Sequence, residues 1–142
     1  MTQLTQNSDQ IKNNYCVIDL ETTGLDYRND AIIELAVIKF GLEGISDTYQ
    51  SFVNPGRKIP SFISDLTGIS DKDVLAAPEF STLIPKLKNF IGDSVLIGHN
   101  VGFDVGFLRE FGFNFEGTIF DTLDLSYVIH PTQLDYSLTG LS

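Results

Sequence analysis

The chain has 142 residues, of which 42% are hydrophobic and 11% aromatic, enough to bury the core of one ordinary globular domain. No apolar stretch approaches the roughly 20 residues of a membrane-spanning helix, and the first residues lack the features of a secretion signal, which predicts a cytoplasmic protein without membrane contact. The net charge of −10 argues against a sequence-independent grip on phosphate backbones, which relies on clustered lysine and arginine. Any nucleic-acid function must therefore obtain its positive charge elsewhere.

The first half of the chain predicts an antiparallel set of strands. Residues 1–13 are polar and are expected to form a disordered tail, and residues 14–142 read as one domain. The apolar, β-branched runs 15–20 and 31–40 predict two strands covered on both faces. A third strand, 47–53, follows a short glycine-containing connection, which indicates a meander.

Helices and strands alternate in the rest of the chain. Pro60 opens a short helix that ends at Gly68, and Ser70 with Asp73 fits a capping box for another brief helix. Pro85 lies inside the next helix, which is expected to bend there or to begin late. The remaining elements are a helix over 79–91, a strand over 94–98, a helix over 103–112, a strand over 118–121 and a helix over 122–129. This order predicts an α/β mixed sheet with helices packed on its faces.

Two acids lie close together in the first predicted strand. Asp19 and Glu21 lie two residues apart, so both side chains point to the same face at the carboxyl end of the strand. Two carboxylates this close repel each other unless a cation lies between them, and oxygen ligands without sulfur suit Mg²⁺ or Mn²⁺. Taken alone, the pair is more typical of a strand that simply ends in solvent, and it decides little.

A second polar cluster follows the fourth strand. His99 and Asn100 lie at the strand exit, and Asp104 lies in the first turn of a helix whose apolar stripe includes Phe103 and Phe107. Each residue has a simple structural reading: a hydrogen-bonded loop histidine, an acid at a helix N-terminus, and phenylalanines in the core. Side chains that converge from two strand ends, however, match the place where open α/β sheets bind their ligands.

These two segments carry a family resemblance. The stretch "VIDLETTGL" (17–25) resembles the first motif, and "HNVGFDVGFL" (99–108) the second, of the DnaQ-like DEDD 3′–5′ exonucleases of the ribonuclease H-like superfamily. The connecting text "FVNPGRKIPSFISDLTGISDKDV" is similar to DNA polymerase III proofreading exonucleases and to the exonuclease domain that begins DinG-type helicases. The resemblance runs from Tyr15 to the last residue and implies a ribonuclease H-like sheet whose last helix is missing.

The resemblance also assigns roles by position. It implies that Asp19 and Glu21 bind two catalytic ions, Mg²⁺ or Mn²⁺, and that Asp104 supports the second ion. Two such ions about 4 Å apart activate a water and stabilise the departing 3′-oxygen, and they supply the missing positive charge. The residues implied in substrate binding are Thr22, Thr23 and Leu25 around the 3′-terminal nucleotide, His99 near a phosphate, Asn100 bracing the loop, and Phe103 or Phe107 against the terminal bases.

The family's third motif, a histidine followed five residues later by an aspartate, is not expected in this chain. His130 and Asp135 have that spacing, but they come only 26 residues after Asp104, and Pro131 directly follows the histidine. We therefore expect a domain truncated at Ser142 before its third motif. The absent aspartate is a metal ligand and the absent histidine the general base, so the chain itself is expected to be inactive or nearly so, with apolar surface uncovered on one sheet face.

The sequence thus predicts an exonuclease domain for the 3′ ends of single-stranded DNA, joined to a helicase or polymerase moiety. Two alternatives remain open. One is a non-catalytic interaction module of the same fold, and the other is a 3′–5′ exoribonuclease. Arg57 and Lys58 could touch a phosphate, although two adjacent charges are weak support.

Overall fold

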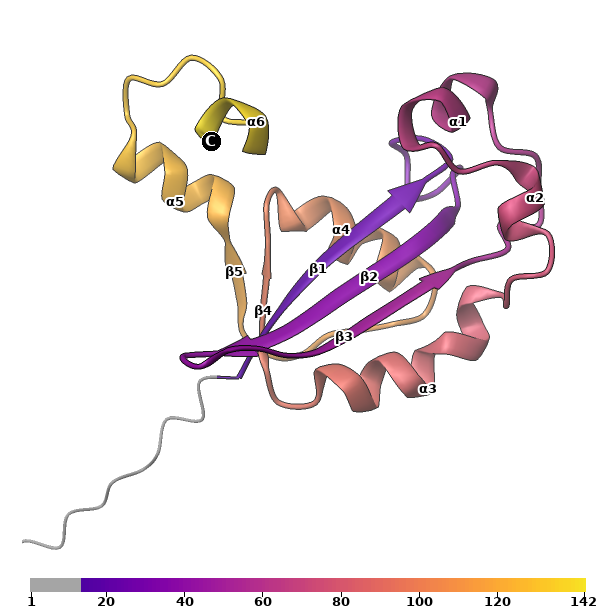
Figure 1. Cartoon of the computed structure of the whole chain (residues 1–142), viewed down its shortest axis with the longest axis horizontal. Coiled ribbons are helices and arrows are strands. Elements are labelled where there is room, and N and C mark those ends of the chain that lie inside the picture. Colours follow the sequence, from indigo (N-terminus) through magenta and orange to yellow (C-terminus); the bar gives the residue numbers. More distant parts are fainter. Residues whose placement is uncertain (1–13) are drawn as a thin grey trace, which may run out of the picture.

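A computed structural model describes residues 14–142, so the tail expected over residues 1–13 lies outside the described residues (Figure 1). The described strands form one sheet in the order β3-β2-β1-β4-β5. The pairs β1–β2 and β2–β3 are antiparallel, while β1–β4 and β4–β5 are parallel. The strands are β1 (Tyr15–Thr22), β2 (Ile32–Gly41), β3 (Gly44–Phe52), β4 (Val95–Gly98) and β5 (Ile119–Asp121). The predicted mixed sheet, a meander followed by parallel strands, is confirmed.

The helices also follow the predicted order. The expected stop of α1 at Gly68 is confirmed by a left-handed φ of 77°, and Ser70 and Asp73 form the expected capping box. The helix with Pro85 begins at Phe80 and does not begin late, because the apolar stripe of Leu83 and Leu87 is buried from its first turn onward. The helices are α1 (Ser61–Thr67), α2 (Asp71–Val74), α3 (Phe80–Ile91), α4 (Val101–Glu110), α5 (Thr122–Ile129) and α6 (Leu138–Leu141). None of these helices is long and apolar enough to cross a bilayer.

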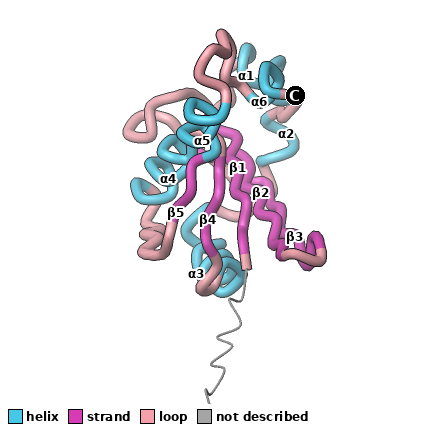
Figure 2. Tube along the Cα trace, turned by 90° about the vertical axis from the view of Figure 1, so that its left-hand side faces the viewer, coloured by secondary structure: helices cyan, strands magenta, loops and turns pink. Residues whose placement is uncertain are grey.

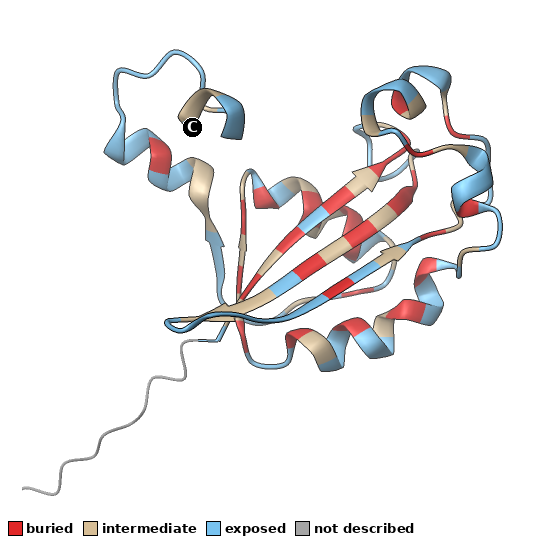
Figure 3. Ribbon diagram, in the orientation of Figure 1, coloured by how far each residue is buried: buried red, intermediate tan, exposed pale blue. Residues whose placement is uncertain are grey.

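The main core lies on one face of the sheet, under α3 and α4. Alternate residues of β1 point into it, and Figure 3 shows this alternation along β1 and β2. Leu87 of α3 and Phe107 of α4 are completely buried there. The β1 residues in this core are Cys16, Ile18 and Leu20. A smaller cluster joins Ile33 of β2 to the region of α1 and α2.

The opposite face of the sheet corrects one expectation, that the strands are covered on both faces. Figures 1 and 2 show α4 on one side of the sheet only, and it packs there in the same core as α3. On the other side Ile38 is 37% exposed and Phe120 44% exposed, while their neighbours Val17 and Ile97 are half-buried. Among the described residues, the main core therefore covers a single face of the sheet.

Candidate active site

The candidate site lies where β1 and β4 stop pairing and diverge. Strand β4 pairs with β1 only as far as Val17, and Figure 1 shows the two strands diverging toward their carboxyl ends with α4 behind them. Beyond the last pair, the Leu20 N–H of β1 donates to Oδ1 of Asp104 at 3.1 Å. Asp104, only 6% exposed, thus takes the place that a continuing strand would have filled. Because Asp19 flanks Leu20, α4 brings an acid to the acidic end of β1.

The pKa values of Asp19, Glu21 and Asp104 are raised above those of ordinary carboxyl groups. Burial, and then the nearby Asp19 carboxylate, raise the pKa of Asp104 to about 7, although the Leu20 N–H acts in the opposite direction. Burial and Glu34 raise the pKa of Asp19, and burial, Asp19 and Glu34 raise that of Glu21. The pKa values are raised because the ionised carboxylates repel one another and are poorly solvated. A cation among them would relieve both effects.

The acids that extend this cluster were missed by the sequence interpretation. Glu34 lies directly opposite Glu21 across the β1–β2 pair and accepts from Gln50 Nε2 at 2.6 Å. No sequence signal placed it there, because the loop over residues 23–31 that joins β1 to β2 does not set the register of the pair. Asp121 ends β5, and its negative charge further raises the pKa of Asp104. Its signal was an acid at the carboxyl end of a parallel strand, where such sites form.

The oxygen ligands of the cluster suit a hard divalent ion, but their present positions do not form a site for one. All of the acids offer oxygen ligands, as Mg²⁺ and Mn²⁺ prefer. Within residues 14–142, however, no three histidine, cysteine, aspartate or glutamate side chains lie close enough together to hold one ion. Asp19 repels both Glu21 and Asp104, so it is the shared member of two interacting pairs. A closed ligand set would require these side chains to turn toward one another.

The two threonines after Glu21 shape the loop that follows β1. Thr22 Oγ1 donates to the Gly24 carbonyl at 2.6 Å. Thr23 Oγ1 accepts from the Ala31 N–H at 2.9 Å and lies 3.3 Å from Oδ1 of Asp30, to which it donates. Both threonines are buried, so their hydroxyl groups serve the loop itself. The loop presents Leu25, which is 85% exposed, as its apolar contact surface.

His99 and Asn100 hold the β4–α4 turn. The His99 ring lies between Thr122 Oγ1, 3.0 Å from Nδ1, and the Tyr136 carbonyl, 2.7 Å from Nε2. Both ring nitrogens are thus engaged inside the protein, and a contact with phosphate would first have to displace one partner. Asn100 adopts the left-handed conformation, with φ 60°, and its side chain does not cap α4. The expected bracing of the loop comes from its backbone N–H, which donates to Asp121.

An aromatic row runs along α4. Phe103 and Phe107 have ring centroids 5.0 Å apart, and Tyr27 meets Phe107 edge-on at 6.3 Å. The alternative that Phe107 contacts a base is wrong for this structure, because its ring is completely buried in the core. Phe103 is half-buried and keeps exposed surface. Tyr27, which the sequence interpretation did not single out, is 39% exposed at the end of the row.

The remaining polar candidates serve local structure. Arg57 donates to the Asn29 carbonyl and so braces the loop after β1. His130 is exposed at the end of α5, and its backbone N–H donates to the Ser126 carbonyl. Asp135 accepts from the Ser137 N–H. His130 and Asp135 thus each contact the backbone of their own segment.

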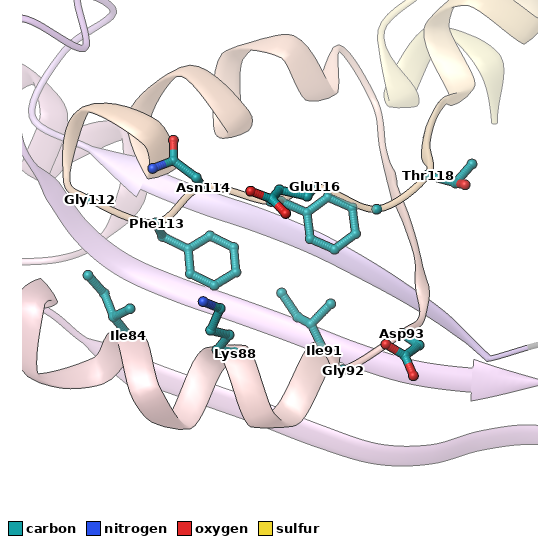
Figure 4. Close-up of a pocket in the computed structure, with 12 residues that line it drawn as sticks. Ile84, Lys88, Ile91, Gly92, Asp93, Gly112, Phe113, Asn114, Glu116 and Thr118 are labelled. Carbon is teal, nitrogen blue, oxygen red and sulfur yellow. The ribbon is translucent and has the colours of Figure 1, made fainter.

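A cavity of about 700 Å³ lies elsewhere in the molecule, between α3 and residues 112–118 (Figure 4). Ile84, Ile91 and Phe113 line it, together with the Lys88 side chain. None of the acids at the end of β1 lines this cavity. It is therefore separate from the candidate site.

Comparisons with known proteins agree with this arrangement. Residues 16–141 match the model of the exonuclease family RNase_T. The PolC-type DNA polymerase III of Caldanaerobacter subterraneus subsp. tengcongensis is 38% identical over 141 residues, covering 96% of this chain and 10% of the relative. That of Staphylococcus aureus is 37% identical over 134 residues, covering 90% of this chain and 9% of the relative. The chain thus spans about a tenth of the length of these curated relatives.

Solved exonuclease structures share the fold. Exonuclease X in complex with 5′ overhanging duplex DNA superposes with a TM-score of 0.73 at 25% identity, covering 89% of this chain and 70% of that one. E. coli exonuclease I in complex with a dA16 oligonucleotide superposes with a TM-score of 0.72 at 16% identity, covering 87% and 32% of the two chains, and supports the fold alone. On the family match and these relatives, the chain belongs to the DnaQ-like DEDD exonucleases, within the RNase_T exonuclease family.

Proposed function

We propose that this exonuclease domain removes nucleotides from the 3′ end of single-stranded DNA by metal-dependent hydrolysis. The observation that carries the proposal is the meeting of β1 and α4 at one end of the sheet, where Asp19, Glu21 and Asp104 all have raised pKa values. Proteins rarely gather poorly solvated acids without a cation or a catalytic use for them. Membership of an exonuclease family gives that use.

Asp19 and Glu21 would hold two Mg²⁺ or Mn²⁺ ions, with Asp104 as a further ligand. When bound, the ions supply the charge that activates water and stabilises the leaving 3′-oxygen. The chain's own part is positional: the Leu20 N–H holds the Asp104 carboxylate beside β1, and the strand itself fixes Asp19 and Glu21 on one face. The ions would also offset the net charge of −10 near a phosphate backbone.

The substrate end would lie against the exposed apolar side chains that border the acids. Leu25 on the loop and Phe103 on α4 offer such surface, and apolar contact with base faces tolerates any sequence. Thr22 and Thr23 would act through the loop they shape, and Asn100 through the turn it occupies. His99 would reach a phosphate after releasing the Tyr136 carbonyl. DNA is favoured over RNA because the similar curated proteins are DNA polymerases.

The proposal extends to partners and location. The chain matches about a tenth of each PolC-type relative, which supports work beside a polymerase moiety. A helicase moiety, indicated by the resemblance of residues 52–74, is the other arrangement. DNA as substrate also supports a cytoplasmic location.

A second candidate function is a non-catalytic module of the same fold. The observation that favours it is that no three potential ligands among residues 14–142 lie within reach of one ion. The His99 ring also engages both of its nitrogens inside the protein, so this histidine does not stand ready as a general base. This candidate predicts weak Mn²⁺ binding and no hydrolysis.

The test is a 5′-labelled single-stranded DNA incubated with the chain and Mn²⁺, beside RNA of the same sequence. We expect a slow ladder that shortens from the 3′ end and disappears in EDTA and in Asp19→Ala. Equal laddering by Asp19→Ala would contradict the assigned site. An intact DNA end in the presence of bound Mn²⁺ would favour the non-catalytic module, and shortening of RNA alone would reassign the substrate.

A further inference from the structure

A single carboxylate at the end of β5 caps two helices at once. Asp121 Oδ1 accepts from the N–H groups of Asn100 and Leu123, each at 2.9 Å, and Oδ2 accepts from the Val101 N–H at 2.9 Å. Asn100 and Val101 begin α4, whereas Leu123 lies in the first turn of α5. The first N–H groups of a helix have no partner within the helix, and a carboxylate there also interacts favourably with the helix dipole. Asp121 therefore ties the starts of α4 and α5 to one point.

The turn that Asp121 holds is a demanding one. Asn100 has φ 60° and ψ 42°, a left-handed conformation that L residues adopt at a cost. Gly98, two residues earlier, has no room for a Cβ atom, which would lie 2.7 Å from Val101 Cγ2. Thr122 Oγ1 adds a hydrogen bond to the Gly98 carbonyl at 3.1 Å. A turn of this kind persists only where its surroundings fix it, and Asp121 with Thr122 provides that hold.

We call the contacts of Asp121 with Asn100, Val101 and Leu123 the clamp. It lies one helical turn from the candidate site. Asp104 follows Val101 by three residues, so the point at which α4 begins decides where the Asp104 carboxylate lies against β1. That carboxylate is buried and accepts from the Leu20 N–H at 3.1 Å. A chain of contacts thus runs from Asp121 through the first turn of α4 to Asp104 and β1.

We infer that Asp121 is a positioning residue for the exonuclease reaction: its clamp on Asn100 and Val101 holds Asp104 in register with Leu20, beside Asp19. The inference rests on the proposed function for its catalytic consequence. The positional part stands apart from it, because the Leu20 amide reports the place of Asp104 whether or not DNA is cut. A merely local cap would hold the turn without affecting β1.

Amide hydrogen exchange, followed by NMR, separates these roles. In Asp121→Ala we expect the Val101 and Leu20 amides to exchange about tenfold faster or more, as loss of a cap and of the held carboxylate implies, while the Cys16 amide of the same strand is unchanged. Asp121→Asn, which keeps one acceptor oxygen, should show a smaller change at the same positions. The matched control is Asp124→Asn, an exposed acid in the first turn of α5. Acceleration at Val101 with an unchanged Leu20 amide would overturn the inference.

The catalytic consequence is measured on the same variants. For Asp121→Asn we expect kcat for single-stranded DNA to fall about tenfold and KM to rise by a smaller factor, because Asp104 and Phe103 shift with α4 while Leu25, on the loop after β1, stays in place. An unchanged kcat despite a faster Leu20 amide would also overturn the inference. Absence of activity in every protein, wild type included, would count against the proposed function and leave the exchange result to decide the positional role.

Discussion

The two faces of β1 differ in what their side chains do. Cys16, Ile18 and Leu20 point into the core under α3 and α4, whereas Asp19 and Glu21, between and beyond them, point to the open face. Packing on the first face supplies the stability that allows repelling carboxylates on the second. The comparison teaches that a single alternating strand can carry the fold on one side and the chemistry on the other.

The open face is itself divided along the strand. Val17 of β1 and its neighbours Ile38 and Ile97 form an apolar half toward the amino end of β1, and the acids occupy the carboxyl end. These apolar residues keep more exposed surface than the residues of the covered face. We therefore expect substitutions on the two faces to differ most in stability, and substitutions at the acidic end to differ most in pH dependence.

The largest expected effect comes from two isoleucines on opposite faces of neighbouring strands. Ile18→Ala removes a side chain that is 2% exposed and should lower the free energy of unfolding by about 2–5 kcal/mol. Ile38→Ala, at a position 37% exposed, should cost about 1 kcal/mol or less. Urea unfolding of both variants measures the difference. Equal losses would mean that the open face is packed as tightly as the covered one.

Asp104→Asn should stabilise the protein at alkaline pH. The folded-state pKa of Asp104 is raised to about 7, so the folded state binds more protons than the unfolded chain between roughly pH 4 and pH 7, and stability falls as pH rises through that window. Removing the charge should raise the free energy of unfolding at pH 8 by about 2–4 kcal/mol, and by less at pH 5. Urea unfolding in EDTA at both pH values tests this. A variant less stable than wild type at pH 8 would show that the ionised carboxylate is well satisfied.

Thr23→Val should loosen the loop beside the acids. The Thr23 hydroxyl accepts from the buried Ala31 N–H, and valine leaves that donor without this partner at a cost of about 1–3 kcal/mol. Thr23→Ser keeps the hydroxyl and serves as the control. Thermal unfolding measures both variants, and similar losses for valine and serine would mean that the methyl group, not the hydrogen bond, matters.

Leu25→Ala should have the smallest effect on stability and a visible effect on substrate. The side chain is 85% exposed, so the free energy of unfolding should change by about 0.5 kcal/mol or less. KM for single-stranded DNA should rise several-fold, because an apolar contact with the terminal nucleotide is lost. Leu42→Ala, at a position 87% exposed on the distant β2–β3 turn, is the control. The same KM for both variants would remove Leu25 from the substrate surface.

Much of the fold could be predicted because local signals agreed with it. The β-branched runs of β1 and β2, the glycine at the end of α1 and the apolar stripe of α3 each fixed an element. One error concerns the sheet, whose open face was expected to be covered, and the others lie at boundaries. Strand β3 begins at Gly44 and not at residue 47, because the hairpin turn between Gly41 and Gly44 is tighter than expected. Helix α4 begins at Val101, two residues early, because Asp121 caps it from another strand.

The site was predicted less completely, because several of its contacts join elements that are far apart in the sequence. Motif spacing singled out Asp19, Glu21 and Asp104, but it could not show that Asp104 accepts from the Leu20 N–H. Glu34 reaches the cluster through strand pairing, which no local pattern encodes. Asp121 lies at the carboxyl end of a parallel strand, a signal that pointed to the site but not to its contacts with α4. Phe107 was a candidate for base contact from its place in the motif, and only the packing of α4 shows that it is buried.

Thermal unfolding at pH 8 in Mn²⁺ and in EDTA tests the central claim, that the acidic end of β1 binds a divalent cation. A ligand that binds only the folded state stabilises it, so 1 mM Mn²⁺ should raise the wild-type Tm by about 3 °C or more. Asp19→Ala should lose this shift, and Asp65→Ala, an exposed acid on α1, should keep it. An equal Mn²⁺ shift in Asp19→Ala, or no shift in the wild type, would contradict the account.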